Sequence, residues 1–553
     1  MDRFAVSRKA VISQTSGQPL NLFSAIFNEN SLSKIAVECD QKALTYADLR
    51  AETLRIAASL ESLGISSGDR IALLLNDSPE FIASFIAIAS SGAIAVPINM
   101  GLRLDEQHLI LKDCGASVAL VESGLTDTLL RNSQQSLRQL KEVIVVCRGE
   151  NQSQWESPSS YETGLRIQTL SDLLSETKDR SAPEFPSAGD KKPAFILYTS
   201  GSTGEPKGAV HSQTHIFYTN DTFCREVLKL NPNDRIFSSS RLPFAYGLGN
   251  SLSFPLLNGA TTILTRQKPS AEVISRILVD YKPTVFFGVP VIYNLLLEHH
   301  RRGHPLDCSS LRICISAGEA LPAQLGEEWE KTFGVQVLDG IGSTEMLHMF
   351  MSNHEGEVSY GSSGKVLEGY AARLLDEHEN PTPPGVEGNL WVKGESAALE
   401  YWQKPEASAR TFVDGWVRTG DLYRSDDGYW FHMGRSDDCF KSSGQWVSPV
   451  EVEGALLRHE RVSRAAVVED FDKDGLPCAC AFVICREDAP DLDRIEVELR
   501  ELLKNSLPRF KQPRRFLFVS ELPYTATGKI QRFKLREQLR KSAEHGPRLG
   551  AAL

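Results

Sequence analysis

The sequence predicts an α/β protein with a β-rich region and a small, separate α+β unit at its C-terminal end. Residues 34–125 and His211–Ser363 each alternate short apolar runs with helix-like segments, which is the pattern of doubly wound α/β regions. From Gly364 to His432 the pattern changes to short strands separated by Gly and Pro, which predicts a β-rich subdomain. The segment of about 115 residues after Gly434–Asp438 combines helix and strand patterns and is long enough to fold as a domain.

The first α/β stretch contains a segment that is apolar enough to be compared with a membrane span. Phe81–Ile98 has no charged residue over eighteen positions, which is close to the lower limit for a helix that crosses a bilayer. Serines, Gly92 and Pro97 interrupt it, and the strand-like run Arg70–Leu75 precedes it. We therefore expect a buried βαβ unit, in which a helix ends near Gly92 and a second strand covers Ala93–Val96.

The other elements follow from capping residues and short apolar runs. Thr45 is a good N-cap for the helix-like segment that follows it. Runs of four or five apolar and β-branched residues predict buried strands in both α/β stretches. The expected elements are a helix over Thr45–Gly64 and strands over Ser117–Val121, Thr261–Leu264, Thr284–Phe287, Leu311–Ile315 and Gly388–Val392.

The composition and charge indicate a globular protein whose ligands are small molecules. A formal net charge of −11 over 553 residues argues against a sequence-independent grip on nucleic acid or acidic lipid. The ten cysteines are scattered without CxxC pairs, which is typical of reduced thiols in a cytosolic protein. Met1–Pro19 has no continuous apolar core after its basic residues, so we expect no signal peptide and a cytoplasmic protein.

A Gly- and Ser-rich run, Tyr198–Gly208, follows the strand-like run Ala194–Leu197. Its glycines let the backbone approach an anion, its hydroxyl and N–H groups donate hydrogen bonds, and Lys207 supplies positive charge. A loop at the end of a parallel strand lies where α/β sheets bind ligands. The run is not a Walker A motif, because two residues stand between Gly204 and Lys207. It predicts a phosphate-binding loop, and a flexible linker is the alternative.

Four further motifs accompany this loop: Ser316–Glu319, Asp339–Glu345, Arg418–Asp421 followed by Gly434–Arg435, and Thr525–Ile530. In this order the five motifs resemble those of the acyl-adenylate-forming superfamily, which comprises acyl-CoA and aryl-CoA ligases, peptide-synthetase adenylation domains and luciferases. The resemblance covers about residues 25–540. It implies an N-terminal domain, residues 1–436, that binds ATP and an aryl acid, and a mobile C-terminal domain, residues 437–553. It also implies that a carboxylate and ATP give acyl-AMP and pyrophosphate, and that a thiol then displaces AMP.

The resemblance implies a role for each motif in binding ATP and Mg²⁺. The loop would contact the β- and γ-phosphates, and two glycine-containing segments would enclose the adenine. Glu345 would be the Mg²⁺ ligand with Thr344 on the α-phosphate, and Asp421 would accept hydrogen bonds from the ribose with Arg435 beside it. The loop residues are Thr199, Ser200, Gly201, Ser202, Thr203 and Lys207, and the adenine residues are Ser316, Ala317, Gly318, Glu319, Asp339 and Gly340.

The C-terminal motifs would serve the two half-reactions in turn. Lys529 would orient the substrate carboxylate and stabilise the charge that develops on the α-phosphate, so we expect it to be the main catalytic residue of the first half-reaction. Asp437 matches the family's hinge position, where one residue absorbs the rotation of the C-terminal domain. Ser443 and Gly444 would line the tunnel for the pantetheine arm of coenzyme A. The family commonly has two glycines in this loop, and Ser443 stands in place of the first.

The acid-binding residues resemble those of benzoate-type aryl-CoA ligases. The positions that wall the acid pocket there correspond to Ala245, Tyr246, Gly342, His348 and Met349. Ala and Gly leave room for a flat ring, Tyr246 offers an aromatic face or edge, and His348 can hydrogen-bond the carboxylate or a ring substituent. Met349 stands where many members have Ile, and its deformable side chain favours a substituted ring such as aminobenzoate or hydroxybenzoate. The predicted enzyme is an AMP-forming aryl acid–CoA ligase that uses ATP, Mg²⁺ and coenzyme A.

Two other functions stay open on the sequence. One is a stand-alone adenylation enzyme that loads an aryl acid onto a carrier protein; adenylation domains for α-amino acids typically place an Asp within the region matching Phe244–Gly247, and none is present. The other is a non-catalytic nucleotide-binding sensor, against which the joint presence of Lys207, Glu345, Asp421 and Lys529 argues. A membrane-bound fatty acyl ligase is disfavoured by the aromatic pocket. The ring substituents and a homodimeric state are left open.

Overall fold

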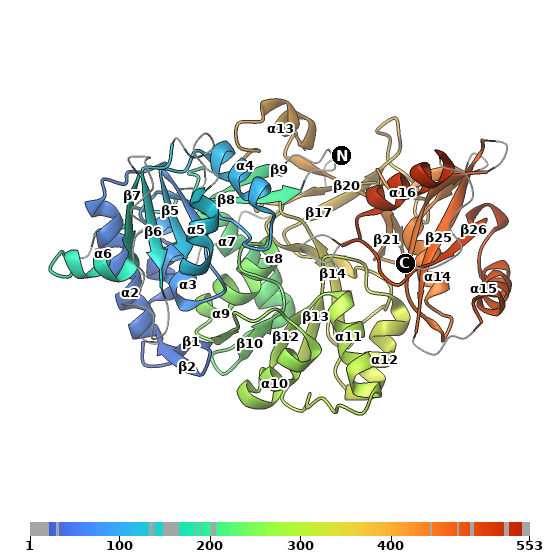
Figure 1. Cartoon of the computed structure of the whole chain (residues 1–553), viewed down its shortest axis with the longest axis horizontal. Helices are drawn as coiled ribbons and strands as arrows, with labels where there is room; N and C mark the ends of the chain where they lie inside the picture. The colour runs from blue at the N-terminus through green and yellow to red at the C-terminus, as the bar shows by residue number, and fades with distance from the viewer. Residues whose placement is uncertain are drawn as a thin grey trace.

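The computed structural model describes residues 21–28, 32–131, 137, 139–147, 165–181, 183–189, 191–200, 206–442, 445–472, 475–486, 491–524 and 530–544. Figure 1 shows the chain passing from a blue α/β unit at the left, through a green and yellow α/β unit in the centre, to an orange and red unit at the right. All ten cysteines are free, as expected of reduced thiols. Among the helices of the described ranges, none combines the length and apolarity needed to cross a membrane.

The first α/β unit is built on a seven-stranded sheet in the order β7-β6-β5-β3-β4-β8-β9. Its neighbouring strands are parallel except for β8 and β9, which form an antiparallel hairpin at one edge. Helix α3 (Pro79–Ser90) is capped by Ser78 and is buried along nearly its whole length, which explains its apolar sequence without a bilayer. The strands are β3 (Arg70–Leu74), β4 (Ile94–Pro97), β5 (Val118–Glu122), β6 (Glu142–Val146), β7 (Arg166–Thr169), β8 (Phe195–Ser200) and β9 (Pro206–His211); the helices are α1 (Leu22–Ile26), α2 (Tyr46–Ser62, capped by Thr45), α4 (Leu104–Cys114), α5 (Ser123–Arg131) and α6 (Leu170–Glu176).

The second α/β unit is built on a nine-stranded sheet in the order β16-β15-β14-β13-β12-β10-β11-β1-β2. The strands from β1 to β14 in this order are parallel, and β2, β15 and β16 pair antiparallel at the edges. One core of this unit packs Phe286 of the sheet against Tyr293 and Trp329 of two helices. The strands are β1 (Ile35–Cys39), β2 (Lys42–Thr45), β10 (Arg235–Ser238), β11 (Thr261–Leu264), β12 (Val285–Gly288), β13 (Ile313–Ser316), β14 (Val337–Gly342), β15 (Met349–Ser352) and β16 (Lys365–Val366); the helices are α7 (Gln213–Thr219), η2 (Asn220–Leu228), α8 (Ala245–Leu248), η3 (Gly249–Ser253), α9 (Phe254–Leu257), α10 (Ala271–Tyr281), α11 (Pro290–Arg301) and α12 (Ala323–Phe333).

The β-rich region forms an antiparallel five-stranded sheet in the order β17-β18-β20-β19, with β21 paired to β20. The hairpin of β20 and β21 is the longest part of this sheet and carries the Arg-Thr-Gly-Asp motif on its first strand. The predicted β-rich subdomain is therefore confirmed. Its elements are β17 (Ala371–Leu375), β18 (Gly388–Lys393), α13 (Pro405–Thr411), β19 (Phe412–Val413), β20 (Trp416–Asp426) and β21 (Tyr429–Arg435).

The C-terminal unit has its own three-stranded sheet, β24-β25-β26, with a separate apolar cluster on each face. One cluster contains side chains of α14 and α15, and the other contains side chains of α16. The α/β fold class with a small C-terminal unit is confirmed, and the boundary between residues 436 and 437 stays a prediction. The elements are β22 (Phe440–Ser442), β23 (Gln445–Val447), α14 (Pro449–Leu456), β24 (Val462–Phe471), β25 (Pro477–Cys485), α15 (Leu492–Ser506), η4 (Arg509–Lys511), β26 (Arg515–Phe518) and α16 (Arg532–Glu544).

Candidate active site

The predicted phosphate loop joins the two strands of the β8–β9 hairpin. Thr199 pairs with Lys207 across the hairpin, so both ends of the loop are held in register. Gly201, Ser202 and Thr203 lie outside the described residues, as does the side chain of Ser200. The hairpin therefore holds the two ends of the loop, Ser200 and Pro206, next to each other.

Residues 398–402, which sequence reasoning misses, lie beside β9 as an additional strand-like segment. Backbone hydrogen bonds of 2.7, 2.8 and 2.9 Å join this segment to residues 208–210. The Tyr401 hydroxyl donates to Glu345 Oε1 at 2.6 Å, and Lys207 Nζ lies 5.4 Å from the centroid of the Tyr401 ring. Burial and the charge of Glu345 raise the pKa of Tyr401 well above its usual range, so the hydroxyl remains a donor. The Tyr401 side chain thus links the phosphate hairpin to the predicted metal ligand.

Thr344 lies in the loop between β14 and β15, and its carbonyl is held by a pair of buried histidines. The carbonyl is 2.8 Å from His211 Nε2, and the Nδ1 atoms of His211 and His215 are 2.9 Å apart. Because a carbonyl only accepts, His211 Nε2 carries the hydrogen and His211 Nδ1 accepts from His215. Burial lowers the pKa of His211 well below its ordinary value and that of His215 to about 4, so both rings are neutral. The pair ties the end of β9 to the loop that carries Glu345.

The predicted ribose residues face each other on the β20–β21 hairpin, where Asp421 is paired with Arg435. Arg435 Nη1 lies 3.3 Å from Asp421 Oδ1, and His432 Nε2 lies 3.6 Å from the same oxygen. The charge of Asp421 raises the pKa of the Arg435 guanidinium. The structure therefore brings the two predicted residues together and adds His432, for which the sequence carries no motif.

The two predicted adenine segments begin on the neighbouring parallel strands β13 and β14. Ser316 and Asp339 are paired in the sheet, and both side chains are buried. Burial raises the pKa of Asp339 to about 8, although the Leu321 N–H donates to its Oδ2 at 3.3 Å. Because the strands are parallel, residues 317–319 follow β13 at the level of the sheet where Asp339 and Gly340 lie on β14, so the two predicted adenine segments are neighbours.

The predicted catalytic lysine, Lys529, lies outside the described residues, as do Ser443 and Gly444. Its neighbour Ile530 is described, and the Ile530 N–H donates to Glu319 Oε1 at 3.3 Å. A β-bridge between Tyr524 and Ile530 closes the base of the segment that contains Lys529. This segment therefore begins and ends beside the predicted adenine residues.

The five predicted pocket residues come from two places in the chain and meet beside β14. Ala245 and Tyr246 belong to α8, whereas Gly342 and Met349 are paired across β14 and β15. The ring centroids of Tyr246 and His348 are 5.5 Å apart. A Cβ on Gly342 would lie 2.5 Å from the His348 carbonyl oxygen, so only glycine fits there. The structure thus places these residues on α8 and at the ends of the β14–β15 loop, and their role as an acid pocket stays a prediction.

Side chains outside the five predicted pocket residues hold His348 in place. Its Nε2 lies 3.1 Å from Asn250 Oδ1, and the rings of Phe223 and Phe254 lie at centroid distances of 5.1 and 4.6 Å. The Asn250 amide nitrogen donates to Ser238, so its oxygen faces the imidazole and Nε2 carries the hydrogen. Within the described residues Nδ1 has no hydrogen-bond partner, and burial lowers the pKa of His348 to about 3. His348 is therefore a neutral ring with an unpaired acceptor.

Two family models match this chain. The model for AMP-binding enzymes matches residues 25–402, and the model for the AMP-binding enzyme C-terminal domain matches residues 451–529. The chain belongs to the AMP-binding enzyme family. The resemblance carried by the five motifs is thereby confirmed.

Relatives of this AMP-binding enzyme match it over nearly its whole length. A benzoate–CoA ligase of Thauera aromatica is 39% identical over 507 residues, which are 90% of this chain and 91% of that protein. The crystal structure of the anthranilate CoA ligase AuaEII in complex with anthranoyl-AMP gives a TM-score of 0.87 at 35% identity, over 95% of this chain and 98% of that one. A benzoate CoA ligase from Burkholderia xenovorans LB400 gives 0.83 at 36% identity, over 94% and 100%.

In this AMP-binding enzyme the predicted hinge residue, Asp437, lies between two residues that are held by different parts of the chain. The Ser436 hydroxyl donates to the Gly420 carbonyl of the β-rich sheet at 3.0 Å. The Asp438 carboxylate pairs with Arg536 of α16 at 3.0 Å. Asp437 therefore lies between Ser436, which is bonded to the β-rich unit, and Asp438, which is paired with the C-terminal unit.

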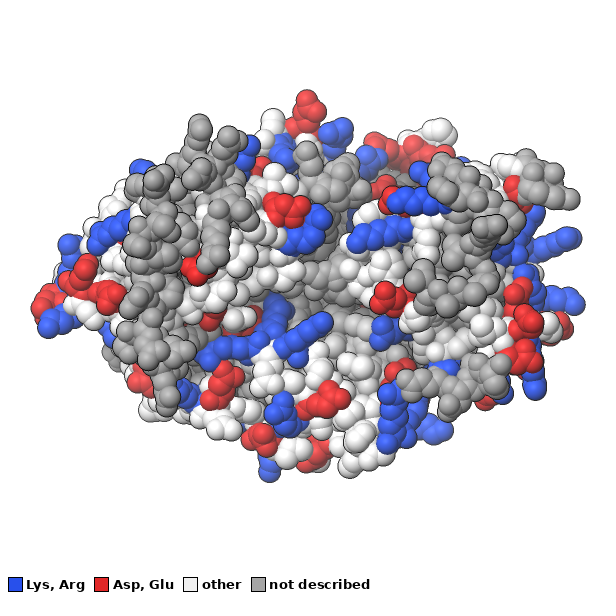
Figure 2. Space-filling model, in the orientation of Figure 1, with Lys and Arg blue, Asp and Glu red and all other residues white. Residues whose placement is uncertain are grey.

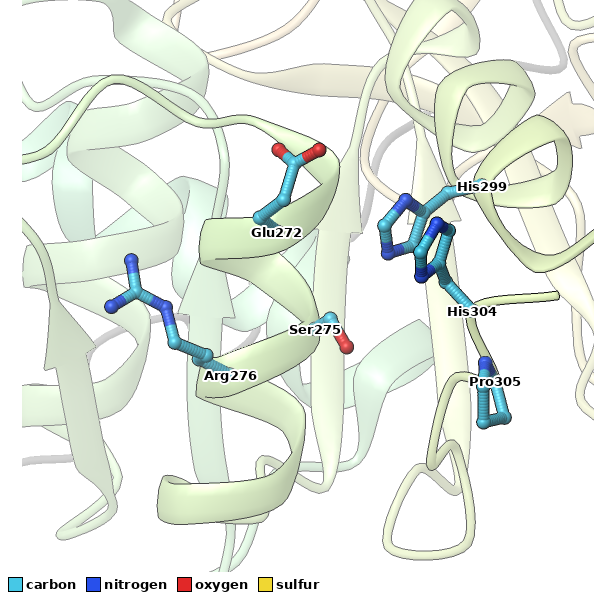
Figure 3. A pocket seen from close by; sticks show the side chains of 6 residues that line it. All are labelled: Glu272, Ser275, Arg276, His299, His304 and Pro305. Carbon is cyan, nitrogen blue, oxygen red and sulfur yellow. The ribbon is translucent and has the colours of Figure 1, made fainter. Parts of the chain in front are cut away.

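A surface pocket elsewhere on the AMP-binding enzyme contains none of the predicted site residues. The rings of two of its histidines stack with centroids 4.5 Å apart. In the part of the chain that the structure describes, no three His, Cys, Asp or Glu side chains are arranged to hold a metal ion. Acidic and basic side chains are interspersed over the face in Figure 2. The pocket lies between α10 and the end of α11 and is lined by Glu272, Ser275, Arg276, His299, His304 and Pro305 (Figure 3).

Proposed function

We propose that this chain is an ATP-dependent aryl acid–CoA ligase that forms an acyl-AMP intermediate and releases AMP and pyrophosphate. The acid is benzoate or a substituted benzoate such as 2-aminobenzoate. The observation that carries the proposal is the β14–β15 loop, which holds pocket residues at both ends and Glu345 between them. Glu345 in turn reaches the phosphate hairpin through Tyr401. Relatives named as benzoate and anthranilate CoA ligases support this class of acid.

The first half-reaction joins a carboxylate oxygen of the aryl acid to the α-phosphorus of ATP and breaks the bond to pyrophosphate. Repulsion between the carboxylate and the phosphates opposes this step, and a single fixed donor can contribute roughly 10²–10³ in rate. Lys207 and Thr199, at the base of the loop, would hold the β- and γ-phosphates together with residues 200–203. Asp421 would accept hydrogen bonds from the ribose hydroxyls, held in place by Arg435.

Glu345 is the residue that would hold Mg²⁺. It offers one carboxylate, of which Tyr401 occupies one oxygen. This donor set fits Mg²⁺, which takes few protein carboxylates and completes its shell with phosphate oxygens and water. When bound, Mg²⁺ neutralises phosphate charge. Thr344, whose carbonyl is fixed by His211, would place its hydroxyl at the α-phosphate.

Lys529 would orient the substrate carboxylate and stabilise charge on the α-phosphate during the first half-reaction. In the second half-reaction the thiol of coenzyme A attacks the acyl carbonyl, the C–O bond to phosphate breaks, and AMP leaves. A rotation about Asp437 would exchange Lys529 for Ser443 and Gly444 at the site. The division of the chain at residues 436 and 437 belongs to this proposal.

The unpaired acceptor of His348 indicates which aryl acids the pocket favours. Its Nδ1 is a buried acceptor that the described residues leave unpaired. A site that can hydrogen-bond a substrate donor discriminates against an analogue that lacks the donor, because the buried polar group is then left without a partner. We therefore expect amino- or hydroxybenzoates to have higher kcat/KM than benzoate.

The test is a substrate panel of benzoate, 2-aminobenzoate, 2- and 4-hydroxybenzoate and a medium-chain fatty acid, assayed with ATP, Mg²⁺ and free coenzyme A. We expect thioester formation with the aryl acids, compared as kcat/KM. A preference for the fatty acid would contradict the aryl assignment. Loading of a carrier protein without any free CoA thioester would favour the carrier-loading enzyme, and absence of aryl-acid-dependent ATP–pyrophosphate exchange would favour a non-catalytic sensor.

Two further predictions belong to this proposal. A cytoplasmic location is consistent with the ten free cysteines. A homodimer is the assembly to test by light scattering on the purified chain, which distinguishes one chain from two by mass.

A further inference from the structure

Tyr401 lies outside the five sequence motifs and contacts two of them. The residue is 5% exposed, and its backbone belongs to the segment paired with β9. The Ala398 N–H of the same segment donates to the Glu345 carbonyl at 2.7 Å. The segment therefore holds Glu345 through its backbone as well as through the Tyr401 hydroxyl.

The hydrogen bond from Tyr401 constrains the Glu345 carboxylate directly. A distance of 2.6 Å is typical of a hydroxyl that donates to an ionised carboxylate. The bond engages one lone pair of Oε1 and leaves Oε2 free of this constraint. A carboxylate with one oxygen fixed loses less rotational freedom when it binds a metal, which favours binding.

The surroundings of Tyr401 keep the hydroxyl in this place. Its ring packs against Phe412 at a centroid distance of 5.3 Å, and Lys207 Nζ lies over the ring. The ring therefore has a packing role that a phenylalanine would preserve, and the hydroxyl has a separate role that a phenylalanine would remove.

We propose that Tyr401 is a positioning residue that orients the Glu345 carboxylate for Mg²⁺–ATP. This inference rests on the proposed function, in which Glu345 holds the metal. It extends the site to a residue 56 positions away from Glu345 in the chain.

The experiment compares Tyr401→Phe with a matched control, Tyr370→Phe. Tyr370 is also buried, and its hydroxyl lies 2.9 Å from Ser396 Oγ, which is not one of the predicted site residues. Calorimetry measures ATP binding to the full chain with Mg²⁺ and with EDTA, and ATP–pyrophosphate exchange measures the Mg²⁺ concentration for half-maximal rate. We expect Y401F to raise that concentration about tenfold and to weaken ATP binding only when Mg²⁺ is present, whereas Y370F changes neither.

A double variant decides whether Tyr401 acts through Glu345. In a Glu345→Gln background, Y401F should cause no further change in Mg²⁺ dependence, because the partner of the hydroxyl has lost its charge. Equal weakening of ATP binding with and without Mg²⁺, or the same Mg²⁺ dependence for Y401F and wild type, would overturn the proposal. The calorimetric measurement needs no aryl acid, so it decides the role of Tyr401 even if the wild-type protein shows no exchange and the proposed function fails.

Discussion

Gly249, the first residue of η3, lies against the imidazole of His348, and one added methyl group there is expected to raise the KM for the aryl acid. A Cβ at this position would lie 2.4 Å from His348 Cδ2 and 3.1 Å from Phe254 Cε2. Both neighbours are buried, so the imidazole must shift and lose its contact with Asn250. Overpacking of this kind costs about 1–3 kcal/mol, which corresponds to about 5- to 150-fold in an equilibrium constant. Because His348 walls the proposed acid pocket, a displaced imidazole takes space from the acid, and we expect the KM for benzoate to rise by up to this factor.

The assay is ATP–pyrophosphate exchange by Gly249→Ala, with benzoate varied at saturating ATP and ATP varied at saturating benzoate. The KM for ATP should be unchanged. Gly124→Ala is the matched control, because an added Cβ in that helix meets no atom within 4 Å. Thermal melting of both variants reports whether they are folded. A folded G249A protein with an unchanged KM for benzoate, or with equal rises for benzoate and ATP, would refute the placement of His348 at the acid.

Three further outcomes follow from the structure. Glu319→Ala removes the acceptor of the Ile530 N–H and should slow acyl-AMP formation while leaving CoA transfer from supplied acyl-AMP intact. Glu319→Gln keeps an acceptor and should be closer to wild type. Equal loss of both half-reactions in Glu319→Ala would contradict this prediction. Lys529→Ala should abolish acyl-AMP formation but spare CoA transfer, and Lys207→Ala should impair the overall reaction less than Lys529→Ala does. Single-turnover measurements of each half-reaction separate these cases. Equal loss of both half-reactions in K529A would contradict the role of Lys529 in the first one. Burial lowers the pKa of His215 to about 4 in the folded chain, against an ordinary value of 6.5. Between these two pH values the unfolded chain therefore binds more protons than the folded chain does. The free energy of unfolding should fall by about 1.4 kcal/mol per pH unit as the pH decreases from 6.5 towards 4. The drop in Tm between pH 7 and pH 5 should therefore be smaller in His215→Gln than in wild type, and an equal drop would argue against a neutral His215.

Much of the scaffold could be predicted from the sequence because local patterns determine it. Thr45 accepts the hydrogen bond that caps α2, and Ser78 with Pro79 starts α3, so both helices begin at residues with the right local chemistry. The order of strands could not be predicted in this way. The pairing of Val37 with Thr262, for example, joins distant segments whose contact depends on the packing of the whole unit.

In the candidate site, too, residues in local sequence patterns could be predicted and residues that act through distant contacts could not. Residues in the Gly-rich and acidic loops could be predicted, because phosphate and metal binding require particular residue types close together in the chain. Tyr401, His211 and Asn250 could not, because each acts on a partner 56, 133 or 98 positions away and lies in a segment of ordinary composition. Such residues become visible only when the fold brings the partners into contact.

The C-terminal unit contains a buried ion pair of its own, whereas two of its polar contacts with the rest of the chain are weak. Across the boundary, Ile530 contacts Glu319 through one hydrogen bond. The ion pair of Lys441 with Glu377, at 2.8 Å, also crosses the boundary, and both side chains are exposed, so solvent and salt screen it. Within the unit, Arg532 pairs with buried Glu453 at 2.8 Å. A rotation about Asp437 would keep the buried pair and break the two contacts named above, which fits the two proposed half-reactions, in which the unit brings Lys529 and then Gly444 to one site.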